Sequence, residues 1–105
     1  MHHKKKKAKV IVVMPAYNAA KTLEKTYRDI PKKYIDEIIL VDDYSKDSTV
    51  EIARKLKIDK IVKHERNKGY GANQKTCYKQ ALKDNGDIII MLHPDYQYDP
   101  KTIPE

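Results

Sequence analysis

Four short apolar runs alternate with amphipathic stretches along the chain, and this alternation constrains the fold more than any other feature. The runs lie at 10–14, 38–41, 61–62 and 88–92, and Pro15 is expected to end the first of them. Continuous apolar runs of this kind are typical of strands that are buried on both faces of a parallel sheet. The sequence therefore predicts a three-layer α/β fold, in which an open parallel sheet of about four strands carries helices on both faces.

Capping and turn residues predict where the helices between these strands begin and end. The first helix is expected at 19–30, with Asn18 as its N-cap and Pro31 just beyond its last residue. The second helix is expected to be capped by Asp47 or Ser48. The third is expected to stop at an Asn-Gly pair, which is a common helix end.

Basic residues outnumber acidic ones, but the excess is concentrated at one end. The 105 residues are enough for one small domain, and they include 22 Lys and Arg against 15 Asp and Glu, a formal charge of +7. Four lysines are consecutive at 4–7. We predict a basic, disordered arm at 1–8 and a folded domain at 9–105. Two interpretations of the arm stay open: a solvated segment, or an electrostatic contact with a membrane surface or nucleic acid.

Cysteine usage and hydropathy limit the compartment. A single cysteine, Cys77, excludes an internal disulfide, and its place in a predicted helix indicates a packing residue rather than a nucleophile. No apolar run approaches the roughly 20 residues needed to cross a bilayer, and the charged N-terminus lacks the apolar region of a signal peptide. We therefore expect a cytoplasmic protein. The many Lys and Ile residues and the three Gly residues are typical of a thermophile.

Candidate functional residues follow the predicted strands, where open α/β sheets bind their ligands. They are Pro15, Ala16, Tyr17 and Asn18 after the first strand, Asp42 and Asp43 after the second, and His93, Asp95 and Gln97 after the fourth. Aromatic rings can stack on a base, and amides and carboxylates can bind its hydrogen-bonding groups. A carboxylate can also hold Mg²⁺ on a diphosphate. These groups together predict a nucleotide site.

Several other classes of protein lack support in the sequence. Neither a P-loop nor a G-x-G-x-x-G motif follows the first strand, which argues against P-loop NTPases and dinucleotide-dependent dehydrogenases. A phosphoacceptor receiver domain would need an isolated Asp after the third strand, and none is there. A basic nucleic-acid-binding α/β domain stays an alternative, but the basic residues outside the arm are scattered, so we expect no specific nucleic-acid partner.

Four segments in order along the chain resemble the successive motifs of family 2 glycosyltransferases, which have the GT-A fold. They read VVMPAYN at 12–18, VDDYSKDST at 41–49, NKGYGA at 67–72 and DYQYDP at 95–100. The most similar branch is that of dolichyl-phosphate mannose synthase and related polyprenyl-phosphate sugar transferases. The resemblance covers 9–105 and implies the donor-binding part of an incomplete GT-A domain, with the chain ending in mid-domain.

The resemblance assigns roles to individual positions of the nucleotide site. Pro15 and Tyr17 match residues that line the nucleotide pocket, and Asp43 matches the acid that accepts a hydrogen bond from the base. Val41 packs beside that acid, and Asp42 could exchange roles with its neighbour. The full set of expected donor contacts is Pro15, Ala16, Tyr17, Asn18, Val41, Asp42, Asp43 and Gln97. Plainer interpretations stay open, with Tyr17 as a core aromatic and the two acids as caps of the next helix.

The metal site implied by the resemblance departs from the family pattern. Asp95 matches the last acid of the D-x-D motif, which holds Mg²⁺ or Mn²⁺ on the diphosphate, but it could also be a turn residue. The first acid of that motif is replaced by His93, whose imidazole suits Mn²⁺ better than Mg²⁺. Ala19 stands where the family often has an acid, which removes one nucleotide contact. We predict Asp95 and His93 as the metal ligands. Three alternatives stay open: His93 as an ordinary hydrogen-bonded loop histidine, a metal held by Asp95 and the phosphates alone, or a weakened dependence on metal.

The resemblance also implies a reaction. Family 2 enzymes generally transfer a sugar with inversion, here from a GDP- or UDP-sugar to an acceptor such as a polyprenyl phosphate or a saccharide. The acceptor site and any general base normally come from sequence beyond Asp95, so this chain alone is expected to bind donor without efficient turnover. The alternative is a non-catalytic interaction fragment with a vestigial nucleotide site. The sequence leaves the sugar, the base and the acceptor open, and an exposed sheet edge could produce a homo-oligomer.

Overall fold

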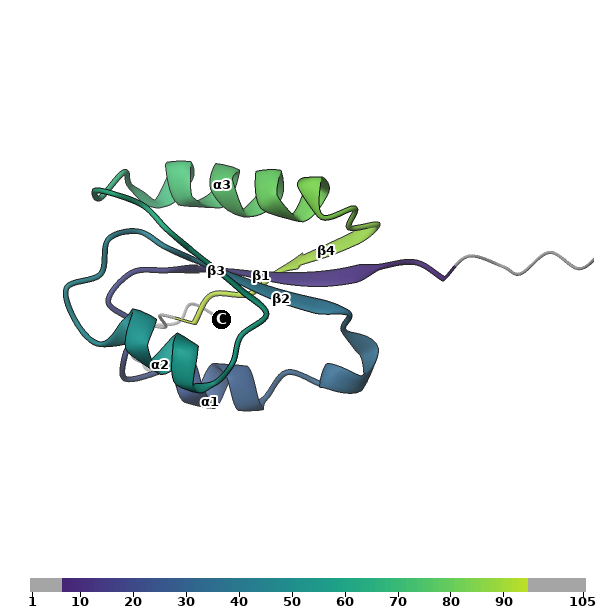
Figure 1. Ribbon diagram of the computed structural model, residues 1–105, viewed down its shortest axis with the longest axis horizontal. Helices are drawn as coiled ribbons and strands as arrows, with labels where there is room; N and C mark the ends of the chain where they lie inside the picture. The colour runs from purple at the N-terminus through teal and green to yellow at the C-terminus, as the bar shows by residue number, and fades with distance from the viewer. Residues whose placement is uncertain (1–6, 95–105) are drawn as a thin grey trace, which may run out of the picture.

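The middle layer of the molecule is a sheet of four parallel strands, shown in Figure 1. The strands are β1 (Val10–Ala16), β2 (Glu37–Asp42), β3 (Lys60–Lys63) and β4 (Ile88–Met91), and they lie side by side in the order β3-β2-β1-β4. The computed structural model describes residues 7–94, so most of the predicted basic arm at 1–8 lies outside the described residues.

Helices cover both faces of this sheet. Helix α3 (Tyr70–Lys83) lies on one face, whereas α1 (Leu23–Arg28) and α2 (Thr49–Lys55) lie on the other (Figure 1). A short 3₁₀ turn, η1 (Lys32–Tyr34), leads from α1 to β2. The three-layer α/β fold predicted from the sequence is therefore confirmed. Within residues 7–94, no helix has the length and apolar character needed to cross a bilayer.

Side chains of the central strands alternate between two apolar cores. On β1, Ile11 and Val13 pack towards α3, whereas Val12 and Met14 pack towards α1 and α2, and all four are at most 3% exposed. Successive residues of a strand point to opposite faces, so a strand with helices on both sides must be apolar throughout. This is the physical reason for the continuous apolar runs in the sequence.

Cys77 belongs to the core beneath α3. Its side chain is fully buried with Ile11, Val13 and Ala81. Burial raises the pKa of the Cys77 thiol to about 12, so the thiolate needed for nucleophilic chemistry is absent at neutral pH. The prediction that this cysteine is a packing residue is confirmed.

Pro15 does not end the first strand, contrary to prediction. Strand β1 continues to Ala16, and Pro15 is in register with Val41 of β2. The carbonyl of Val13 accepts a hydrogen bond from Leu92 on the β4 side, and alternate strand residues direct their backbone groups to the same side. The position of the missing N–H of Pro15 is therefore on the β4 side, beyond the last paired residue of β4, Met91. No ladder hydrogen bond is lost there, so the proline is tolerated.

Helix α1 is shorter than predicted, and Asn18 does not cap it. The helix begins at Leu23, and the side chain of Asn18 instead accepts a hydrogen bond from the backbone N–H of Lys46 at 2.9 Å. The N–H of Ala19 donates to the hydroxyl of Thr49 at 2.8 Å. The N–H groups of Asn18 and Ala20 donate to side chains of the loop after β2, to Ser45 at 2.8 Å and to Asp47 at 3.1 Å, so the segment after β1 is held in a turn before it becomes helical.

Asp47 rather than Ser48 caps α2. The sequence had left both residues as candidates for this cap. Its carboxylate accepts the backbone N–H of Thr49 at 3.0 Å and that of Ala20 at 3.1 Å, whereas Ser48 makes no capping hydrogen bond. Burial raises the pKa of Asp47, but hydrogen bonds from the Thr49 hydroxyl and these N–H groups lower it by more, so the pKa lies below its ordinary value. The ionised form is therefore the one that connects the two loops.

Three aspartates hold the starts of the strands together. Asp36, Asp59 and Asp87 immediately precede β2, β3 and β4. Their carboxylates accept backbone N–H groups of Val10, Ile38 and Lys9 on the neighbouring strand, each at 2.7 Å. Each carboxylate thus satisfies an N–H that the end of the ladder leaves unpaired.

We expect Asp59→Ala to lower the free energy of unfolding by about 1 kcal/mol, because the N–H of Ile38 loses a charged acceptor. Urea unfolding followed by circular dichroism measures this loss. The matched control is Asp29→Ala, which removes a carboxylate that is 68% exposed and pairs with Lys25 one turn away. An equal loss in both variants would show that the strand contact contributes nothing specific.

Next to β4 the sheet is incompletely covered by the described helices. Ile88 and Ile90, whose register with Val10 and Val12 places them on the α1 face, are 48% and 44% exposed. An apolar groove of about 440 Å³ lies there, and its lining includes Ile30.

Candidate functional site

A small polar cavity lies at the carboxyl ends of β1 and β2. Its volume is about 270 Å³, and it is lined by Pro15, Ala16, Tyr17, Asp43, Asn67, Gly69, Tyr70 and Asn73. The groove beside β4 is larger, but the cavity at the strand ends is where a carboxylate, amides and tyrosine side chains converge. Open α/β sheets bind their ligands at this end of the strands, so this cavity is the candidate site.

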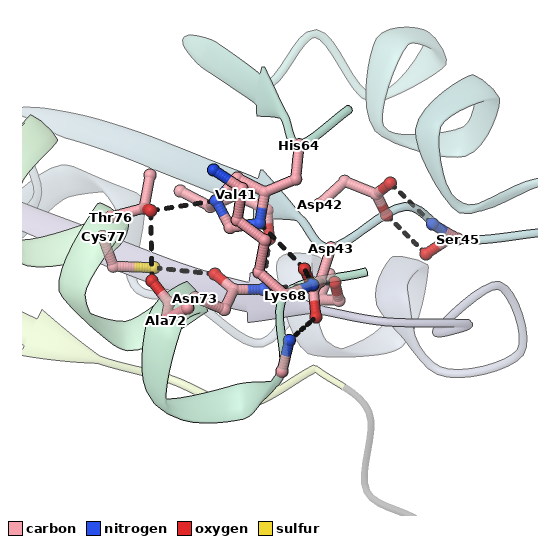
Figure 2. Close-up of polar contacts among 12 residues, drawn as sticks. Val41, Asp42, Asp43, Ser45, His64, Lys68, Ala72, Asn73, Thr76 and Cys77 are labelled. Carbon is pink, nitrogen blue, oxygen red and sulfur yellow. Dashed lines mark hydrogen bonds and ion pairs between the residues drawn. The ribbon is translucent and has the colours of Figure 1, made fainter. Parts of the chain in front are cut away.

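Asp43 is the carboxylate of the cavity, and three donors hold it in place (Figure 2). Its Oδ1 accepts hydrogen bonds from Nδ1 of His64 and from the backbone N–H of Lys68, both at 2.8 Å. Its Oδ2 accepts the backbone N–H of Gly69 at 2.9 Å. The residue is only 3% exposed, so the orientation of the carboxylate is fixed by the protein rather than by solvent.

These contacts determine the charge of Asp43. Burial raises the pKa of this carboxyl, but the hydrogen bonds from His64 and from the N–H groups of Lys68 and Gly69 lower it by more. The pKa of Asp43 therefore lies below its ordinary value of 3.8, and at neutral pH the group is an ionised acceptor.

His64 connects this carboxylate to α3. Its ring is buried, its Nδ1 carries the proton donated to Asp43, and its Nε2 lies 2.9 Å from the hydroxyl oxygen of Thr76. The Thr76 hydroxyl also lies 3.1 Å from the carbonyl of Ala72, one turn earlier in the helix. The end of β3, the end of β2 and α3 are therefore joined through buried polar contacts, all visible in Figure 2.

Asp42 is directed away from the cavity, although it precedes Asp43 directly. Its Oδ2 accepts the backbone N–H of Ser45 at 2.9 Å, and its Oδ1 accepts the Ser45 hydroxyl (Figure 2). Tyr44, which lies between Asp43 and Ser45 in the sequence, adopts a left-handed backbone with φ of 67°. Asp43 therefore lines the cavity, whereas Asp42 binds Ser45 in the loop. Neither acid caps α2, since Asp47 does so.

Of the other predicted nucleotide contacts, Pro15, Ala16 and Tyr17 line the cavity, whereas Asn18 and Val41 do not. Tyr17 is 39% exposed at the cavity rim, so it is not a core aromatic. Asn18 and Val41 do not line the cavity: the Asn18 side chain is bonded to Lys46, and Val41 is fully buried beneath α3. Gln97 lies outside the described residues.

Sequence reasoning missed four residues of this cavity as candidate contacts, namely Asn67, Gly69, Tyr70 and Asn73. Three of them belong to the NKGYGA segment, which the resemblance matched without giving it a role. Asn73 is 2% exposed, and its amide donates to the carbonyl of Val41 at 3.0 Å. The contact between this buried amide on α3 and the end of β2 is the signal that could have identified Asn73. It becomes visible only once the packing of α3 is known.

The described residues do not by themselves form a metal site. No cluster of three His, Cys, Asp or Glu side chains with metal-binding geometry occurs within 7–94. Nε2 of His93 lies 3.1 Å from the hydroxyl of Tyr70, which accepts a hydrogen bond from the Gln74 amide at 2.9 Å. This imidazole nitrogen is thus within hydrogen-bond distance of a tyrosine hydroxyl. Asp95, the other predicted ligand, lies outside the described residues.

A parallel sheet with helices on both faces, and with an acid and a tyrosine gathered at its carboxyl edge, defines an open α/β domain with a candidate ligand site at the ends of its strands. The model of the glycosyl transferase family 2 matches residues 11–105. The chain therefore belongs to glycosyltransferase family 2, and its sheet is that of the GT-A fold.

Two curated relatives carry specific names. The UDP-N-acetylglucosamine–dolichyl-phosphate N-acetylglucosaminyltransferase of Methanococcus voltae is 30% identical over 110 residues, covering 90% of this chain and 44% of the relative. The dolichol-phosphate mannosyltransferase of Pyrococcus furiosus is 31% identical over 103 residues, covering 92% of this chain and 28% of the relative. The chain thus spans less than half the length of these relatives. Both are archaeal, which is consistent with the thermophile-like composition.

Solved structures show the same fold. TarS of S. aureus in complex with UDP has a TM-score of 0.68 and 28% identity, over 83% of this chain and 27% of that protein. Glucosyl-3-phosphoglycerate synthase from Mycobacterium tuberculosis, in complex with Mn²⁺, UDP and glucosyl-3-phosphoglycerate, has a TM-score of 0.69 and 21% identity, over 90% of this chain and 39% of that protein. The sheet and helices described above are therefore the GT-A arrangement found in glycosyltransferases.

Proposed function

We propose that the cavity at the ends of β1 and β2 holds the base of a nucleoside diphosphate sugar. The observation that carries this proposal is the buried, ionised carboxylate of Asp43, which three donors hold at the wall of a cavity beside Tyr17. A fixed acceptor can read an N–H of a base, and a half-exposed tyrosine ring can stack on it. The UDP complex of TarS supports this assignment.

The whole protein would then transfer a sugar from this donor, with inversion, to a lipid phosphate. The acceptor class is supported by the dolichyl-phosphate names of the two curated relatives. An acceptor phosphate is already anionic, so it needs no general base to generate the nucleophile. Residues 9–105 would supply the donor-binding part, and the basic arm at 1–8 would contact the cytoplasmic face of the membrane. The exposed edge of β4 would allow self-association.

A divalent cation, Mg²⁺ or Mn²⁺, belongs to this proposal through Asp95 together with His93 or the phosphates. When bound, such an ion neutralises charge on the leaving diphosphate. Binding of the ion by Nε2 of His93 would replace the contact of this nitrogen with the Tyr70 hydroxyl. Gln97 would lie near the donor.

Titration of the chain with UDP and GDP, with and without Mn²⁺, tests the donor site. We expect amide chemical shifts to change at Tyr17, Asp43 and Gly69, because these residues surround the cavity. Asp29→Ala, at the exposed residue just after α1 and outside the lining of the cavity, is the control variant and should bind as the unmodified chain does. Changes confined to the groove beside β4, or no changes with either nucleotide, would contradict the proposal.

A further inference from the structure

We propose that this cavity selects a uracil base over guanine, because the described residues 7–94 leave Asp43 a single unoccupied acceptor position. The inference rests on the proposed function and identifies the donor as a uridine diphosphate sugar.

The hydrogen bonds of the carboxylate can be counted. Two carboxylate oxygens offer about four acceptor positions in total. Oδ1 already accepts from His64 and from Lys68, and Oδ2 accepts from Gly69, all within the described part of the chain. Both positions on Oδ1 are therefore filled, and one remains on Oδ2.

The carboxylate cannot easily rotate to change this count. His64 is itself fixed by Thr76, and rotation of Asp43 would break bonds to all three donors. The third donor depends on Gly69, whose φ of 95° is a conformation that residues with side chains rarely adopt. The free position on Oδ2 is thus set by backbone as well as by side chains.

The two bases differ in what they offer to such an acceptor. Uracil presents one N–H, at N3, between two carbonyl groups. Guanine presents N1–H and the exocyclic amino group side by side, and this pair fits the two oxygens of an unoccupied carboxylate. With Oδ1 filled, one guanine donor would be buried without a partner, which carries a desolvation penalty. Asn67 lines the same cavity, and an asparagine amide can supply donors of the kind that uracil carbonyls accept.

The lowered pKa of Asp43 sets the direction of the contact with a base. An ionised carboxylate accepts hydrogen bonds and donates none, so the base must supply the proton. Uracil N3–H and guanine N1–H both do this at neutral pH, so the choice between the two bases rests on the number of unoccupied acceptor positions.

Calorimetric titration of the chain with UDP, N3-methyl-UDP and GDP tests the inference. N3-methyl-UDP is the matched ligand, since it differs from UDP only in carrying a methyl group in place of the N3 hydrogen that Asp43 would read. We expect UDP to bind at least about tenfold more tightly than either of the other two. Equal affinity for UDP and GDP, or for UDP and its methylated form, would overturn the inference while leaving a donor site in place. Failure of all three to bind would instead overturn the donor site, and the inference with it.

Two variants of His64 separate positioning of Asp43 from general stability. His64→Asn keeps an amide donor near the position of Nδ1, whereas His64→Leu removes a donor that helps to fix the orientation of the Asp43 carboxylate. We expect the ratio of UDP to GDP affinity to fall about tenfold in His64→Leu and to be largely retained in His64→Asn, with folding of both checked by circular dichroism. A ratio unchanged in His64→Leu would show that His64 does not set the selectivity.

Discussion

Asp43→Ala is expected to lower the free energy of unfolding by about 3 kcal/mol and to abolish nucleotide binding, because it leaves several buried donors without a partner. The affected groups are Nδ1 of His64 and the backbone N–H groups of Lys68 and Gly69. Urea unfolding at neutral pH measures the first effect, and titration with UDP measures the second. Asp29→Ala again serves as control, since that carboxylate is mostly exposed. Wild-type stability in Asp43→Ala would mean that the three contacts are energetically neutral.

The same residue gives this prediction a pH dependence. The pKa of Asp43 is lowered in the folded state from its ordinary value of 3.8, so its stabilising contribution is complete above that value. It is lost as the pH falls below 3.8 and through the lower pKa of the folded state. Asp43→Ala should therefore lose less stability than the unmodified chain over this acidic range. A parallel decline of both proteins would contradict the assignment of the lowered pKa to Asp43.

Leu23→Ala is expected to lower the free energy of unfolding by about 3 kcal/mol, through the cavity it leaves in the core. Leu23 is fully buried at the start of α1, in the cluster that includes Val12, Met14 and Leu40. Helix α1 has only six residues, so it depends on this packing rather than on its own helical stability.

The matched control for this variant is Leu82→Ala, which makes the same chemical change on α3 at a side chain that is 64% exposed. That variant should remain within about 0.5 kcal/mol of the unmodified chain, as exposed substitutions usually do. Urea unfolding of the pair compares them directly. Similar losses in both would show that α1 is not anchored through Leu23.

The element order and the fold class could be predicted because they are encoded locally. Each strand is an apolar run that needs no knowledge of its neighbours to be recognised, and the helices between the strands show their own periodicity. The predictions that failed concern groups whose partners lie far away in the chain. Asn18 was expected to cap a helix, but its side chain is bonded 28 residues later, to Lys46. Pro15 was expected to end a strand, but the neighbouring strand β4 has already ended beside it.

The candidate site shows the same division. Because the site lies where strands end, its general position followed from sequence. Tyr17 and Asp43 both line the cavity, and their roles as nucleotide contacts stay predictions. His64 carried no local signal, since a lone histidine after a short strand has many ordinary uses. Its importance depends on a contact with a carboxylate 21 residues earlier in the chain.

By itself, then, the sequence determined the parallel sheet, the helices on both faces and the edge at which polar groups gather, because strand and helix periodicity are local properties. Only the tertiary structure decided that Asp43 rather than Asp42 faces the cavity, and that His64, Lys68 and Gly69 occupy most of its acceptor positions. Adjacent residues at a strand end point in different directions, and the one that reaches the cavity is set by the packing of β3 and α3 around them.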